Sequence, residues 1–72
     1  MTIKQRILDL IVARPDLTEA EISEHLFGSD GYQQRVNSAC RELVQALWVE
    51  RQGTGGPGDP FRYRRVRVLR AV

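Results

Sequence analysis

The sequence is poor in the residues on which catalysis, metal binding and covalent cross-linking depend. It contains one cysteine, Cys40, and one histidine, His25, so an internal disulfide is impossible. Neither residue has a second His, Cys or paired acid at the spacing of metal ligands. No Ser/His/Asp set is placed to converge on a substrate. We therefore expect no enzyme activity, no metal, no cofactor and no small-molecule substrate.

Long apolar runs are also missing. No stretch of about eighteen apolar residues could form a membrane-spanning helix, and the first residues carry Lys4 and Arg6 where a signal peptide would have its apolar core. The chain is 42% hydrophobic and 28% charged, which is typical of a soluble globular protein. We expect residues 1–72 to form one small cytoplasmic domain with no membrane partner, in which Cys40 is a small buried hydrophobe.

Positive charge is scarce in most of the chain and concentrated in its last third. Residues 1–28 hold three basic and five acidic side chains (−2), and residues 29–50 hold two and three (−1). Residues 51–72 hold six arginines and one aspartate (+5). A clustered basic segment is typical of a domain that binds a polyanion. The alternative is a solubilising tail, for which lysine and glutamate would serve better than arginine.

Apolar residues at helical spacing predict a first helix over about residues 2–14. Thr2 is expected to cap its start, and Pro15 to end it, because the residue before proline is pushed out of the helical conformation. The side chains expected to face the core are Ile3, Ile7, Leu10 and Ile11.

A second helix is predicted over about residues 18–27. Thr18, followed three residues later by Glu21, matches the capping-box pattern at a helix start. Gly28 is well suited to the left-handed conformation that commonly ends a helix. His25 is expected to be a partly exposed helix residue without a ligand role.

The stretch from Asp30 to Leu47 predicts a long helix, over about residues 30–47, with one buried apolar stripe. Polar side chains lie opposite that stripe. Ordinary solvated helices carry Glu and Lys on such a face, whereas Gln, Asn, Ser and Arg can hydrogen-bond base edges in a DNA major groove. The alternative is a polar surface helix with no special role. The residues on this face are Gln34, Asn37, Ser38, Arg41 and Gln45.

Residues 48–68 predict a β-hairpin. Trp48 to Arg51 favours the start of a strand, GTGGPGDP (53–60) a flexible loop, and FRYRRVRV (61–68) a returning strand. The side-chain alternation changes along the second strand, so either a bulge lies near Arg64–Arg65 or the strand ends there. The glycine-rich loop lacks the GxxxxGK[ST] and GxGxxG patterns, which disfavours nucleotide binding.

In this order of elements the chain resembles a winged helix-turn-helix DNA-binding domain over its whole length. LTEAEISEHLFG (17–28) is similar to the first helix of the helix-turn-helix motif, and YQQRVNSACRELVQALWVER (32–51) to the recognition helix and first wing strand. PFRYR (60–64) is similar to the returning wing strand. The resemblance implies an α+β, mainly α fold, in which three helices precede a C-terminal two- or three-stranded β-wing.

The resemblance further implies a small sequence-specific transcriptional regulator that binds double-stranded DNA. The long helix would enter the major groove and the wing would contact the backbone or minor groove. By position, the expected base contacts are Gln33, Gln34, Asn37, Ser38 and Arg41, with Tyr32 mainly a packing residue. The expected backbone or minor-groove contacts are Gln45, Arg51, Arg62, Arg64 and Arg65. Glu42 and Glu50 would weaken binding if they pointed at phosphates.

Trp48 leaves a second hypothesis open, a winged-helix module for protein–protein contact or dimeric assembly. If its ring is exposed beside Val66, Val68 and Leu69, the apolar patch suits a partner or a homodimer; otherwise Trp48 caps the core under the wing. A homodimer would also raise DNA affinity, because two half-sites bind at high effective concentration. Single-strand or RNA binding is a further alternative, since aromatics and arginines are interleaved in residues 61–67.

Overall fold

The computed structural model of the protein describes residues 2–66. Within them the chain forms an α+β, mainly helical fold of three α-helices and one three-stranded antiparallel sheet, as predicted. The helices are α1 (Ile3–Ala13), α2 (Glu19–Phe27) and α3 (Gln33–Gln45), and the strands are β1 (Leu17–Thr18), β2 (Val49–Gln52) and β3 (Arg62–Arg65). None of the helices in residues 2–66 is long and apolar enough to cross a membrane.

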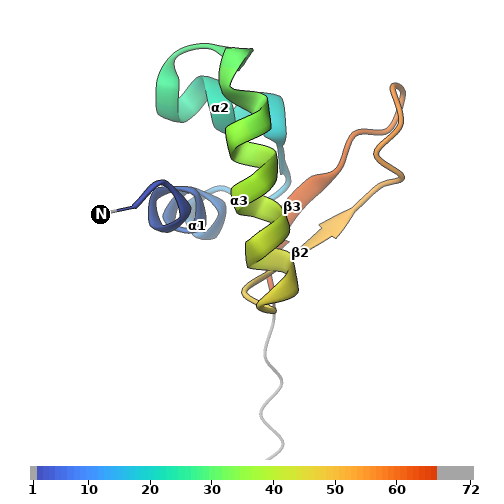
Figure 1. Ribbon diagram of the computed structural model, residues 1–72. Coiled ribbons are helices and arrows are strands. Elements are labelled where there is room, and N and C mark those ends of the chain that lie inside the picture. Colours follow the sequence, from blue (N-terminus) through green and yellow to red (C-terminus); the bar gives the residue numbers. More distant parts are fainter. Residues whose placement is uncertain (1, 67–72) are drawn as a thin grey trace, which may run out of the picture.

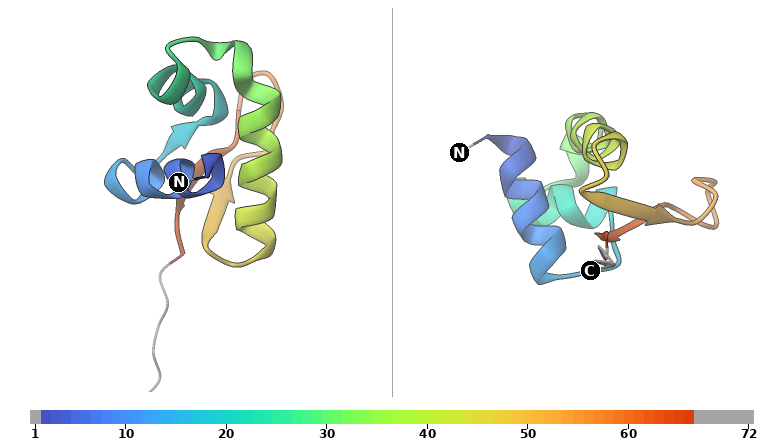
Figure 2. Two further views of the ribbon diagram at one scale, coloured as in Figure 1. Left: turned by 60° about the vertical axis from the view of Figure 1, so that its left-hand side comes forward. Right: turned by 90° about the horizontal axis from the view of Figure 1, so that it is seen from below.

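The helices pack together on one side of the molecule, and the β2–β3 hairpin extends away from them. Figure 1 shows α1 and the hairpin on opposite sides of α3, with the glycine-rich loop at the far tip of the hairpin. The view from below in Figure 2 shows how far this tip stands clear of the helices. The sheet order is β1-β3-β2, so β3, the last strand within residues 2–66, is central.

The ends of α1 and α2 form where the sequence predicts them. The Thr2 hydroxyl accepts a hydrogen bond from the Gln5 backbone N–H at 3.1 Å, and α1 ends before Arg14. Thr18 and Glu21 form both hydrogen bonds of the capping box at the start of α2. Gly28 ends α2 with a φ of 74°, in the left-handed region that glycine adopts without steric cost.

The helix predicted over residues 30–47 is shorter than expected at both ends. Asp30–Tyr32 forms a separate 3₁₀ turn, begun by the Ser29 hydroxyl, which accepts from the Gly31 N–H at 3.0 Å. At the other end, Leu47 has a φ of 64°. Its N–H donates to the Val44 carbonyl and the Trp48 N–H donates to the Leu43 carbonyl, which is the Schellman arrangement of a helix end. A leucine, rather than a glycine, holds the left-handed position, so no glycine marks this helix end in the sequence.

One part of the sheet was not predicted. The sequence indicated no strand between the first two helices, yet Leu17–Thr18 forms β1, which pairs with β3 in the register Leu17↔Tyr63. A two-residue strand has no periodicity to detect. Of the two alternatives for the returning strand, a bulge near Arg64–Arg65 or an end there, the structure shows the second: β3 ends at Arg65, and the Val66 N–H then donates to the Trp48 carbonyl. Val68 lies outside the described residues.

The core joins all three helices to the sheet. Tyr63 is its largest fully buried side chain, because β3 places it beneath the helices. The other buried apolar residues are Ile7, Ile11, Ile22, Val36, Ala39, Cys40, Leu43 and Val49.

One buried polar side chain, Ser23, sets the turn between α2 and α3. Its hydroxyl donates to the Ser29 carbonyl and accepts from the Tyr32 backbone N–H. Tyr32 also packs on the Phe27 ring, with centroids 4.7 Å apart, in agreement with its predicted packing role. Ser23 therefore ties the middle of α2 to the segment that leads into α3, which fixes the angle between the two helices.

Candidate nucleic-acid interface

The outward face of α3 presents four exposed polar side chains. At about 100° per residue they lie on the side opposite the buried stripe that includes Val36 and Leu43. None of the four is acidic, and all can donate hydrogen bonds. They are Gln34, Ser38, Arg41 and Gln45.

Two of the expected base contacts, Gln33 and Asn37, point toward the wing instead. They line a cleft of about 300 Å³ between α3, the start of α2 and the hairpin, whose wall includes Phe61. Asn37 is half-buried there, whereas Gln33 is exposed. The five predicted base-contact residues therefore divide into an outward row and a row beside the wing.

Arg51 lies on the sheet face that is directed toward the helices. It is paired with Tyr63 across β2 and β3, and directly paired residues project to the same face. Its guanidinium carbon lies 4.1 Å from the centroid of the Phe61 ring, within the range of a cation–π contact. Arg51 is exposed, so this stacked guanidinium is accessible beside α3.

Gly55 in the wing loop lies against the Phe61 ring. A Cβ at position 55 would lie 2.5 Å from the ring, and Gly55 also has a φ of 82°. Only glycine satisfies both the close approach and the positive φ. The stacking of Phe61 on Arg51 was not predicted from the sequence, because it depends on the register of the hairpin.

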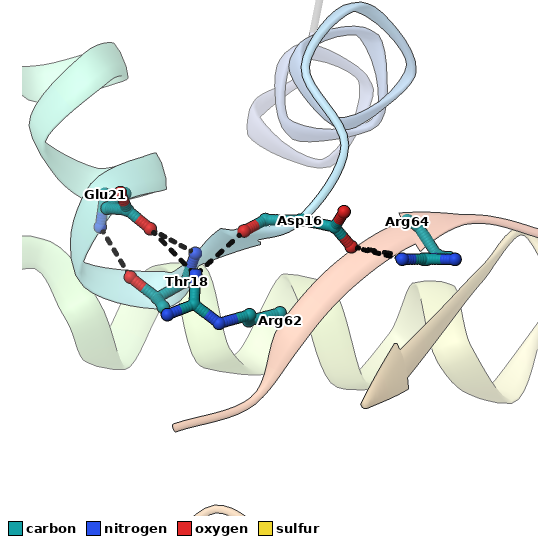
Figure 3. Close-up of polar contacts among 5 residues, drawn as sticks. All are labelled: Asp16, Thr18, Glu21, Arg62 and Arg64. Carbon is teal, nitrogen blue, oxygen red and sulfur yellow. Dashed lines mark hydrogen bonds and ion pairs between the residues drawn. The ribbon is translucent and has the colours of Figure 1, made fainter. Parts of the chain in front are cut away.

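Arg62 and Arg64 occupy the opposite face of the sheet, since they flank Tyr63 along β3. Arg64 donates from Nη2 and Nε to the Asp16 carboxylate at 2.7 and 3.1 Å (Figure 3). Arg62 donates to the Asp16 carbonyl at 3.2 Å and lies 3.9 Å from Glu21. The hydrogen bonds to Asp16 raise the pKa of Arg64 above its ordinary value. Both of these expected wing contacts are therefore paired with acids of the same chain.

Glu42 and Glu50, the two acids that would weaken DNA binding if they pointed at phosphates, lie away from the face formed by α3 and Arg51. Glu42 is on the flank of α3 and forms an ion pair with Lys4 of α1 at 3.0 Å. Glu50 is paired with Arg64 across the sheet, so it projects with Arg64 to the outer face. Arg65, also predicted to contact the backbone, pairs with Val49 and is exposed at the end of β3 nearest Trp48.

An acid that sequence reasoning missed lies in the cleft between α3 and the wing. The Tyr63 hydroxyl donates to Glu19 Oε2 at 2.6 Å, and Glu19 lines the same cleft as Asn37. Burial of the ring, assisted by this hydrogen bond, raises the pKa of Tyr63 above its ordinary value. The carboxylate is thus fixed in place where it could accept a hydrogen bond from an amino group that enters the cleft.

The remaining predicted residues concern assembly and the thiol. Trp48 is 60% exposed, so it does not cap the core. Val66 follows β3 next to Trp48, whereas Val68 and Leu69 lie outside the described residues. Burial raises the pKa of the Cys40 thiol to about 12, in keeping with its prediction as a buried hydrophobe.

Comparison of the chain with models of protein families, with curated proteins and with solved structures gave no match.

Proposed function

We propose that the protein is a small winged helix-turn-helix transcriptional regulator that binds double-stranded DNA through α3 and the Arg51 side of the wing. The observation that carries the proposal is the continuity of the two surfaces. The outward face of α3, with Arg41 at its middle, carries only polar or basic groups, and the exposed Arg51 stacks on Phe61, which lines a cleft with Gln33 and Asn37 of α3. The acids Glu42 and Glu50 are directed elsewhere.

The size and chemistry of α3 fit a major groove. Thirteen residues give a helix of about 20 Å, and a major groove about 12 Å wide admits an α-helix. Arg41 can donate two hydrogen bonds to a guanine, and Gln34 can pair with an adenine. In this arrangement Gln33 and Asn37 would contact bases or backbone nearer the wing.

The wing would supply phosphate contacts through Arg51. A guanidinium stacked on an aromatic ring keeps its N–H groups free, and less side-chain entropy is lost when it binds a phosphate. Arg65 and Gln45 remain candidate backbone contacts. Arg62 and Arg64 are paired with Glu21 and Asp16, whose charges offset theirs, so we assign them a smaller share of the binding.

Fluorescence anisotropy with a random pool of duplex DNA at about 50 and 200 mM salt tests the proposal. We expect binding at the lower salt that weakens strongly at the higher. Absence of binding at the lower salt would refute DNA binding, and stronger competition by single-stranded DNA or RNA than by duplex would favour those ligands instead.

Matched single substitutions, each removing one positive charge, then locate the surface. Arg51→Gln should weaken binding to all sequences and reduce the salt slope by about one. Arg41→Gln should cost about 1–3 kcal/mol on a selected site and relax its base preference. Arg64→Gln is the control on the other face, with thermal melting used to correct for the loss of its bond to Asp16. An equal loss for Arg64→Gln and Arg51→Gln would show that the wrong face of the wing had been assigned.

A further inference from the structure

The C-terminal end of α3 exposes two large apolar side chains next to each other. Leu47 is 75% exposed and Trp48 is 60% exposed. Trp48 also lines a cleft of about 340 Å³ between α1 and α3, together with the apolar side chains of Leu8, Leu43 and Ala46. An apolar projection and a partly apolar hollow therefore share one surface, which we call the Leu47 corner.

Within residues 2–66, no contact accounts for a leucine at position 47. Its φ of 64° is a conformation that glycine adopts freely and that an L side chain adopts only with strain. The side chain is mostly exposed, so burial within the domain offsets little of that strain. Strained residues are commonly found where a protein makes functional contacts.

We propose that the Leu47 corner is a contact between two copies of this chain, in which Leu47 of each copy inserts into the α1–α3 cleft of the other. A two-fold axis brings the same surface of both copies together, so the surface must be complementary to itself. The projection at Leu47 and the adjacent cleft satisfy this requirement, because each copy offers both.

The charges at the edge of the cleft favour a second copy over a strongly charged partner. Lys4 and Glu42 both line the cleft and are held 3.0 Å apart. Their charges cancel, so the surface has no strong attraction for a polyanion. When the surface meets its own copy, each lysine can face the other copy's glutamate, which avoids repulsion between like charges.

The proposed contact leaves Arg51 and the cleft between α3 and the wing free, and the proposal does not rest on DNA binding. The cleft lies on the side of α3 that faces α1, and Figure 1 shows α1 and the hairpin on opposite sides of α3. The surface is smaller than the roughly 20–30 residues per side of a standard stable interface. We therefore expect a weak dimer, with a dissociation constant in the micromolar to millimolar range.

Sedimentation equilibrium of the full chain, from about 10 μM to 1 mM, tests the proposal. We expect a reversible dimer whose association constant falls at least about tenfold in Leu47→Gly, since the projecting side chains are lost from both copies. Glycine suits the left-handed backbone, so the fold is preserved. Val12→Ser is the matched control, because Val12 is a large apolar residue, 48% exposed, beside a different cleft.

Fluorescence of Trp48, the single tryptophan, gives a second measure of dimer formation. Its emission should shift to shorter wavelength as concentration rises, and Leu47→Gly should suppress the shift. A monomer throughout the range, or an equal effect of Val12→Ser, would overturn the proposal. The proposal would also be overturned if the double variant Val68→Ser, Leu69→Ser lost the dimer while Leu47→Gly retained it. The C-terminal segment would then make the contact.

Discussion

At position 47, glycine should be more stabilising than alanine, the reverse of their order within a helix. Leu47→Gly and Leu47→Ala both remove the leucine side chain beyond Cβ, so they lose nearly the same small buried area. The difference between them therefore reports the backbone. With φ at 64°, alanine keeps the clash between its Cβ and the backbone that glycine avoids.

The size of the effect follows from opposing terms. A left-handed conformation costs an alanine about 1–2 kcal/mol, and the greater freedom of glycine in the unfolded chain costs it about 0.5–1 kcal/mol. We expect Leu47→Gly to be more stable than Leu47→Ala by about 0.5–1 kcal/mol. At Ser38, exposed in the middle of α3, glycine should instead be less stable than alanine by about 0.8–1 kcal/mol.

Urea denaturation of the four variants, at a protein concentration of about 1 μM where a weak dimer dissociates, measures both differences. A difference of 1 kcal/mol corresponds to about 4–8 °C in melting temperature for a domain of this size, so thermal melting offers a check. If alanine were equal to or better than glycine at both positions, residue 47 would not be left-handed and the helix end described above would be wrong.

Four further predictions concern the capping box, the thiol and the core hydroxyl. Thr18→Ala should destabilise the protein by about 1 kcal/mol in urea denaturation, whereas Thr18→Ser should retain most of the cap. A hydrogen bond from the Thr18 backbone N–H lowers the pKa of Glu21 from 4.5. The stability that Glu21 contributes is therefore present above pH 4.5 and is lost as the pH falls below it. The Glu21→Gln variant should lose less stability than the unaltered protein over the same acid titration. Burial raises the pKa of Cys40 from 9.0 to about 12, so a thiol reagent at pH 8 should react slowly with the folded protein and rapidly in urea, and rapid reaction without urea would contradict the burial. Tyr63→Phe should cost about 1–2 kcal/mol, because Glu19 loses its hydrogen-bond donor, and no loss of stability would show that water replaces the hydroxyl.

The helices were predictable because their signals are local. Thr2, Thr18 and Gly28 act within three or four residues of their own position, and the buried stripe of α3 repeats at the helical period. These features depend on backbone sterics and on the separation of apolar from polar side chains, both of which a sequence records directly. The polar residues of the outward face of α3 were identified by the same periodicity.

The parts that were not predicted depend on contacts between distant residues. Asp16 and Arg64 are 48 positions apart, so no local pattern shows that this arginine is paired within the chain. The alternation along residues 61–65 separates Tyr63 from its neighbours but does not tell which face carries a free guanidinium. Placing Arg51 on one face of the sheet and Arg62 and Arg64 on the other required knowledge of the strand register. Locating the end of α3 near Leu47 required knowledge of the backbone conformation there.

The central position of β3 affects the order in which the protein can fold during synthesis. β3 contacts α1 near the start of the chain as well as β1 and β2, and it carries Tyr63, the largest fully buried side chain. A growing chain that has not yet released residues 62–65 from the ribosome leaves β1 and β2 unpaired and the core without that ring. Local helices can form earlier, but cooperative folding must wait until residues 62–65 have emerged.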